Sequence, residues 1–86
     1  MTQDILSSND LIKEKIREIF FQIFPDLKKE DFSWNKKQKD FESWDSFAHL
    51  QLITMCEEIF EIEISLDDTV NITSPDELAN CVKSLK

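Results

Sequence analysis

The chain has 86 residues and a formal net charge of −8, and it contains no glycine. A chain of this length forms one domain, and it buries too little surface to enclose a deep catalytic cleft on all sides. The lack of glycine excludes the phosphate-binding loops and nucleophile elbows that depend on glycine, and the acidic charge disfavours nucleic acid and anionic membranes as partners.

The charge is unevenly distributed along the chain. Residues 1–39 carry eight basic and seven acidic side chains, whereas residues 40–86 carry eleven acidic and two basic ones. An acidic half of this kind attracts partner proteins that have basic docking patches and speeds their encounter. The lysines at positions 36, 37 and 39 are expected to form a solvated loop tip rather than a nucleic-acid site.

Residues 1–8 form a polar lead-in, and a single domain is predicted over residues 9–86. The lead-in lacks the pattern of a signal peptide, and no apolar stretch reaches membrane-spanning length, so a cytoplasmic protein is expected. The first helix is predicted to begin near Asn9 or Asp10, either of which can cap it, and to end before Pro25. Its apolar stripe has helical spacing and consists of Ile12, Ile16, Ile19, Phe20, Ile23 and Phe24.

Residues 25–44 form a long connection that contains four aromatic side chains, namely Phe32, Trp34, Phe41 and Trp44. Long loops in small domains are often functional. For the aromatic residues, packing over the ends of the core is the favoured interpretation, and stacking on a ligand is the alternative.

The second helix is predicted over residues 46–60. A helical wheel assigns one apolar arc to the core, formed by His49, Leu52, Ile53, Cys56, Ile59 and Phe60. The solvent side is assigned to Phe47, Leu50, Gln51, Thr54, Glu57 and Glu58. Phe47 is either covered by the preceding loop or forms, with Leu50, a docking patch for another protein.

Two glutamates, Glu57 and Glu58, lie in the last turn of this helix, where the macrodipole disfavours negative charge and no lysine compensates. They indicate either a partner that recognises acidic side chains or simply a solubilising surface.

The remaining elements are short. Residues 62–66 are expected to be an extended connector that places Ile62 or Ile64 in the core, and residues 67–70 a short helical turn. Ser74, Pro75 and Glu77 have the pattern of a capped helix start, with Leu78, Val82 and Leu85 on the buried face. Cys56 and Cys81 are expected to be buried, reduced core residues. The predicted fold is an all-α bundle of three longer helices and one short helix.

The candidate site is the pair Asp45 and Ser46 at the start of the second helix. Either residue can cap the helix, and Ser46 lies where the positive helix end favours an attached phosphate. Asp45 could help a modifying enzyme to hold a metal ion, or it could only cap. A serine hydrolase would require His49, the only histidine, to pair with Ser46, but an isolated histidine is more often packed or exposed. The acidic residues near Asp67 lack the spacing of an EF-hand, and no metal site is predicted.

The stretch from Asp45 to Ile53, followed by Glu57–Phe60, resembles the recognition helix of acyl and peptidyl carrier proteins. The segments 62–64, 67–68 and 72–74 are similar to the loop, the short third helix and the entry to the last helix of that family, so the resemblance covers about residues 9–85. Phe47 replaces the leucine of the usual Asp-Ser-Leu motif, and Glu42, Ser43 and Trp44 stand where a glycine is common.

The resemblance implies a carrier that is not itself an enzyme. Ser46 would receive 4′-phosphopantetheine from coenzyme A through a separate Mg-dependent phosphopantetheinyl transferase. The thiol of that group, and not Cys56 or Cys81, would carry acyl groups as thioesters. The acidic helix, with Phe47, Leu50 and Thr54 beside Glu57 and Glu58, would dock acyl-transferring, ligating or condensing enzymes.

The sequence leaves the cargo open among fatty acyl, polyketide, aminoacyl and hydroxyacyl groups, in lipid, surface-glycan or secondary-metabolite biosynthesis. A monomer is expected. The alternative is an interaction module that keeps the same fold but is never modified.

Overall fold

The structure, a computed structural model, describes residues 8–85. Its four α-helices are α1 (Ser8–Ile23), α2 (Ser46–Phe60), α3 (Leu66–Asn71) and α4 (Pro75–Leu85), and two single 3₁₀ turns, η2 (Lys29–Asp31) and η3 (Gln38–Asp40), lie in the long connection. Within this part of the chain there is no strand. The prediction of an all-α bundle with three longer helices and one short helix is confirmed.

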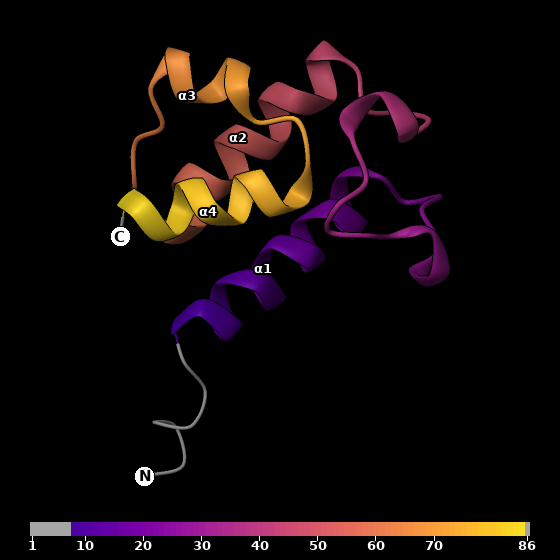
Figure 1. Ribbon diagram of the computed structural model, residues 1–86, viewed down its shortest axis with the longest axis horizontal. Coiled ribbons are helices and arrows are strands. Elements are labelled where there is room, and N and C mark those ends of the chain that lie inside the picture. Colours follow the sequence, from indigo (N-terminus) through magenta and orange to yellow (C-terminus); the bar gives the residue numbers. More distant parts are fainter. Residues whose placement is uncertain (1–7, 86) are drawn as a thin grey trace, which may run out of the picture.

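Helix α1 packs against both α2 and α4, and α3 lies on the side of the bundle away from α1 (Figure 1). The predicted stripe of α1 is buried, with Ile23 only half-buried, and it joins the inner faces of α2 and α4 in one hydrophobic core. No helix between residues 8 and 85 is long and apolar enough to cross a membrane.

The long connection folds back over one end of this core, as predicted from its aromatic residues. Phe41 and Trp44 are buried, and Phe32 and Trp34 are half-buried against the core. Phe20 of α1 is the centre of the cluster, because its ring lies 5.3 Å from Trp44, 5.6 Å from Phe32 and 5.8 Å from Phe41. The two 3₁₀ turns were not predicted, since three residues contain no detectable hydrophobic period.

Glu61 is the C-cap of α2; it has left-handed backbone angles, φ 55° and ψ 53°, and its N–H donates to the carbonyl of Glu57. Glycine usually occupies this position, and a chain without glycine has to use a residue that is strained there. Helix α4 begins as predicted, with the Ser74 hydroxyl accepting from the N–H of Glu77 at 3.2 Å. The Glu77 carboxylate, however, accepts from the N–H and the hydroxyl of Thr73 rather than from Ser74, so the return bond lies one residue earlier than predicted.

Several details of the sequence prediction are wrong. Helix α1 begins at Ser8, so Asn9 and Asp10 are helical residues rather than caps, and residues 1–7 of the lead-in lie outside the described part. Ile59 and Leu85 are exposed, although their wheel positions assign them to the core. A wheel gives only the angle around a helix and does not show which positions the neighbouring elements cover. Cys81 is half-buried rather than buried.

Candidate functional site

Asp45 and Ser46 have distinct roles at the start of α2. Asp45 is the N-cap, because its carboxylate accepts from the N–H of Ala48 at 2.9 Å and its carbonyl accepts from the N–H of His49 at 2.9 Å. Ser46 is the first helical residue, and its side chain is exposed. Since Asp45 supplies the cap, the Ser46 hydroxyl is not used for capping and lies at the surface.

The electrostatic surroundings of Ser46 favour an anion. The N–H groups of Ser46 and Phe47 precede the first intrahelical hydrogen bond, so they have no partner within the helix. Together with the aligned peptide dipoles they form a positive helix end, which stabilises a nearby negative charge by about 0.3–1 kcal/mol. A phosphate ester on a hydroxyl at this point would be favourably placed.

His49, three residues after Ser46, contacts Trp44 and Thr69 rather than Ser46. The indole N–H of Trp44 donates to Nδ1 of His49 at 3.0 Å, and Nε2 of His49 lies 2.7 Å from the carbonyl oxygen of Thr69. An indole N–H can only donate, so Nδ1 accepts and Nε2 carries the proton that it donates to Thr69. Both ring nitrogens are therefore occupied, and His49 joins the loop, α2 and α3 instead of forming a Ser–His pair with Ser46.

The solvent face of α2 carries a row of exposed side chains. Phe47 and Leu50 are 71% and 58% exposed, and Thr54 and Glu58 continue the same row. The loop does not cover Phe47, so that alternative is wrong. Glu57 differs from its expected position, because it is half-buried and its carboxylate accepts from the N–H of Ile64 at 2.9 Å. This bond fixes the connection between α2 and α3. It also explains why an acidic residue stands in the last turn of α2, where no lysine compensates its charge.

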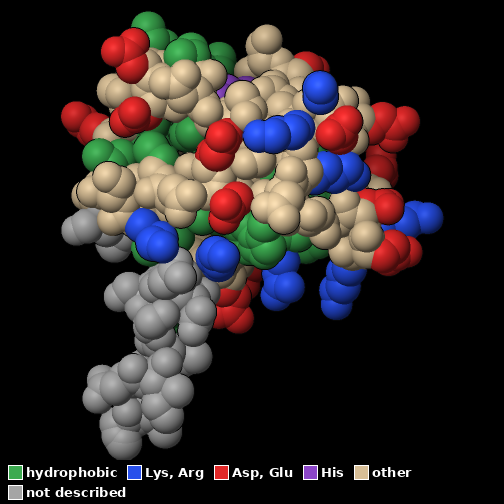
Figure 2. All heavy atoms as spheres, in the orientation of Figure 1, with side chains coloured by type: hydrophobic (Ala, Val, Ile, Leu, Met, Phe, Trp, Pro, Cys, Tyr) green, Lys and Arg blue, Asp and Glu red, His purple; other side chains and the backbone are tan. Residues whose placement is uncertain are grey.

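Helix α3 carries a second pair of exposed apolar side chains, which was not predicted from the sequence. Leu66 and Val70 are 77% and 65% exposed, and their spacing of four residues places them on one face of α3. The bond from His49 to Thr69 joins α3 to the N-terminal half of α2. Figure 2 shows hydrophobic side chains at the surface over the region where Figure 1 has α3. The four-residue spacing of Leu66 and Val70, with two aspartates between them, was the sequence feature that could have indicated an exposed apolar face on this short helix. We call the exposed apolar side chains of the two helices, Phe47 and Leu50 of α2 and Leu66 and Val70 of α3, together the apolar surface.

The two cysteines do not provide a reactive thiol at neutral pH. Burial raises the pKa of Cys56 to about 12, with smaller contributions from Cys81 and Glu57, and burial also raises the pKa of Cys81. A thiol that stays protonated is a poor nucleophile. Among the side chains described, no three histidine, cysteine, aspartate or glutamate residues form a group that could hold a metal ion.

Comparison of the chain with protein-family models, with curated proteins and with solved structures finds no match.

Proposed function

We propose that the protein is an acyl carrier that holds acyl, aminoacyl or hydroxyacyl intermediates on a 4′-phosphopantetheine arm attached to Ser46. The observation that carries the proposal is the division of roles at the start of α2. Asp45 caps the helix, and the Ser46 hydroxyl beside it is exposed at the positive helix end. The Asp-Ser pair in its sequence context, which resembles the carrier family, supports the same function.

Attachment would use the Ser46 hydroxyl as the acceptor of a phosphoryl group. The Ser46 Oγ–P bond forms, the P–O bond within the diphosphate of coenzyme A breaks, adenosine 3′,5′-bisphosphate leaves, and the hydroxyl proton is released. When bound, the group supplies a terminal thiol that holds the acyl group as a thioester. The raised pKa values of Cys56 and Cys81 support the assignment of this role to the added thiol rather than to either cysteine.

Partner enzymes would dock on the acidic side of α2 and on the apolar surface. Exposed large apolar side chains that are surrounded by charges are typical of protein interaction sites, and here Glu58, Asp67 and Asp68 are exposed beside them. A transferase, and acyl-transferring, ligating or condensing enzymes with basic patches, fit this surface. The proposal includes a monomeric cytoplasmic protein that binds neither nucleic acid nor a membrane.

The second candidate is an interaction module that keeps the same surface but is never modified. The exposed apolar surface supports both candidates equally. The carrier is favoured because Asp45 caps α2 and leaves the Ser46 hydroxyl exposed and free for attachment. A serine hydrolase has less support, since both ring nitrogens of His49 are occupied by Trp44 and Thr69.

The test is the intact mass of the protein after incubation with coenzyme A, Mg²⁺ and a promiscuous phosphopantetheinyl transferase. The proposal predicts a gain of one phosphopantetheine. Ser46→Ala should abolish the gain, and Ser43→Ala, which changes an exposed serine three residues earlier, should retain it. An unchanged mass with several transferases would favour the interaction module.

A further inference from the structure

The short helix α3 depends on other elements for its position in the bundle. It has only six residues, and a helix of this length is not stable without tertiary contacts. Its own side-chain hydrogen bonds are local, since the Ser65 hydroxyl accepts from the N–H of Asp68 at 3.1 Å and the Thr69 hydroxyl donates to the carbonyl of Ser65 at 2.9 Å. Attachment to the bundle therefore depends on the buried Thr69 and Ile72 and on bonds from other helices.

A hydrogen bond from His49 joins α3 directly to α2. Nε2 of His49 lies 2.7 Å from the carbonyl oxygen of Thr69, and among residues 8–85 this is the only hydrogen bond between the two helices. Apolar contacts have no preferred direction, whereas a hydrogen bond requires both a short distance and a favourable angle. The bond therefore restricts how far α3 can slide or rotate against α2.

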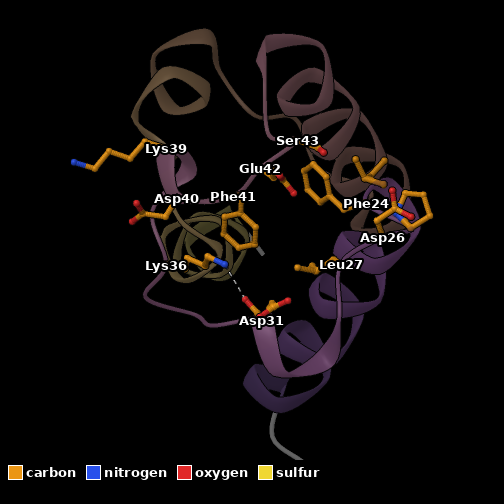
Figure 3. Close-up of a pocket in the computed structure, with 12 residues that line it drawn as sticks. Phe24, Asp26, Leu27, Asp31, Lys36, Lys39, Asp40, Phe41, Glu42 and Ser43 are labelled. Atoms are coloured by element: carbon orange, nitrogen blue, oxygen red, sulfur yellow. Dashed lines mark hydrogen bonds between the residues drawn. The ribbon is translucent and has the colours of Figure 1, made fainter.

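The ring of His49 is itself held by Trp44. The indole N–H donates to Nδ1 at 3.0 Å, which leaves the ring proton on Nε2, where it faces Thr69. Trp44 is buried, and its ring lies 5.3 Å from that of Phe41. Figure 3 shows Phe41 beside Phe24 at a surface pocket of about 680 Å³ between the loop and the end of α1. Trp44 is thus fixed in the aromatic cluster and sets both the orientation and the donor atom of His49.

The bond between His49 and Thr69 lies next to both halves of the apolar surface. Leu50 follows His49 on α2, and Val70 follows Thr69 on α3, so each is separated from a bonded residue by one Cα–Cα step of about 3.8 Å. Ser46 precedes His49 by three residues on the same helix. The placement of the exposed α3 side chains relative to Ser46 is therefore set through His49.

We infer that His49 is a positioning residue for the attachment of phosphopantetheine to Ser46. It holds α3 in the arrangement that a transferase contacting both helices recognises, and it acts through α3, because both of its ring nitrogens are occupied. The inference rests on the proposed function. A docking surface that is already ordered lowers the entropic cost of association, so loss of the link should raise KM for the carrier and leave kcat nearly unchanged.

Two replacements of His49 test this role in steady-state kinetics with a promiscuous transferase. His49→Gln keeps, in one amide, an acceptor for Trp44 and a donor for Thr69, whereas His49→Leu keeps neither. KM for the carrier should rise several-fold in His49→Leu, with kcat nearly unchanged, and stay near the wild-type value in His49→Gln. Equal KM values for His49→Leu and the wild type, or an equal rise in both variants, would overturn the inference.

A control variant separates positioning from a general loss of stability. Ile16 is fully buried in α1, which lies on the side of the bundle away from α3 (Figure 1). Ile16→Ala should lower the unfolding midpoint and leave KM unchanged. A rise in KM for folded Ile16→Ala as large as that for His49→Leu would assign the effect to stability and overturn the inference.

A second comparison tests whether His49 acts through α3. Leu66→Ala should raise KM in the wild-type background and add little in the His49→Leu background, where α3 is no longer held in place. Phe47→Ala, on α2 itself, should raise KM by the same factor in both backgrounds. If Leu66→Ala also has the same effect in both backgrounds, His49 does not act through α3.

The contact itself can be tested in the unmodified wild-type protein. His49 is the only histidine in the chain, so the nuclear magnetic resonance signals of its ring nitrogens are unambiguous. A proton on Nε2 and a coupling from Nδ1 to the indole nitrogen of Trp44 are expected. A neutral ring with its proton on Nδ1 would overturn the inference even if His49→Leu fails to fold. Wild-type protein that gains no phosphopantetheine would instead overturn the proposed function, whereas an unchanged KM in folded His49→Leu would overturn this inference alone.

Discussion

The indole N–H of Trp44 donates to Nδ1 of His49 across 3.0 Å, in a contact where the two rings also stack with centroids 5.8 Å apart. Trp44 is the last buried residue of the loop, and His49 continues the contact to Thr69 of α3. One side chain thus fixes the loop, the start of α2 and the short helix α3 relative to one another. The exposed Ser46 lies between Trp44 and His49 in the sequence, so their contact fixes the backbone on both sides of the candidate site.

His49→Ala should lower the free energy of unfolding by about 1–3 kcal/mol, because it leaves the Trp44 N–H and the Thr69 carbonyl without a partner. Urea denaturation measures the loss. Trp44→Phe removes the donor and part of the ring, so the pair is best tested by a double-mutant cycle. The loss in the free energy of unfolding of the double variant should be smaller than the sum of the two single-variant losses. Additive losses would contradict an energetic link between the two residues.

Replacements of Asp45 separate its capping role from a role in modification. Asp45→Ala should lower stability by about 1 kcal/mol, because the Ala48 N–H loses its acceptor, whereas Asp45→Asn should keep most of the stability. If the carboxylate also helps a transferase to hold its metal ion, Asp45→Asn slows phosphopantetheine attachment although the fold is intact. Thermal unfolding and the rate of mass gain measure the two effects. Equal modification rates for Asp45→Asn and the wild type would assign Asp45 to capping alone.

The carboxyl of Glu77 makes stability depend on pH. Hydrogen bonds from the hydroxyl and then the N–H of Thr73 hold the pKa of Glu77 below its ordinary value. A carboxyl whose pKa is lower in the folded chain stabilises the fold above the unfolded value, about 4.3, and this contribution is lost as the pH falls through the folded value. Glu77→Gln should therefore be less stable than the wild type at pH 7, and the difference should shrink as the pH falls below about 4.3.

Chemical denaturation at a series of pH values measures this difference. Glu58→Gln, at an exposed position on α2, is the control and should show a smaller effect at neutral pH. If the stability difference between Glu77→Gln and the wild type stays constant from pH 7 to the lowest pH at which the protein is folded, the Thr73 contacts do not depend on the ionisation of Glu77.

The apolar surface should affect partner recognition more than stability. Phe47→Ala removes a side chain that is 71% exposed, so helicity and the unfolding midpoint should change little. The rate of modification by a transferase should fall several-fold, and Gln51→Ala, at an exposed position one turn further along α2, should leave it unchanged. Loss of the folded state in Phe47→Ala would contradict its assignment to the surface.

The sequence predicted the helices whose pattern is long enough to be distinctive. The stripe from Ile12 to Phe24 identified α1, and the stop at Pro25 and the start at Ser74 and Pro75 marked helix ends through local chemistry that needs no tertiary contact. The bounds of α2 agree with the prediction at both ends. Asp45 and Ser46 were named from the sequence as candidate site residues, with either able to cap, and the structure shows that Asp45 is the cap.

Features that depend on contacts between distant residues were not predictable from the pattern. Glu57 was assigned to the docking face, because a wheel does not show that its carboxylate reaches the N–H of Ile64. The role of His49 depends on Trp44 and Thr69, and Thr69 lies twenty residues further along the chain. Packing of the loop aromatics over the core was predicted, but a loop without a hydrophobic period does not show that this packing leaves a pocket beside Phe41.

The measurement that tests the central claim most directly is site-resolved mass spectrometry of the protein after reaction with coenzyme A, Mg²⁺ and a phosphopantetheinyl transferase. The account predicts one added phosphopantetheine, located by fragmentation on Ser46, with no gain in Ser46→Ala and an undiminished gain in Ser43→Ala. A protein that stays unmodified with several transferases, or one that carries the group on another residue, would contradict the account.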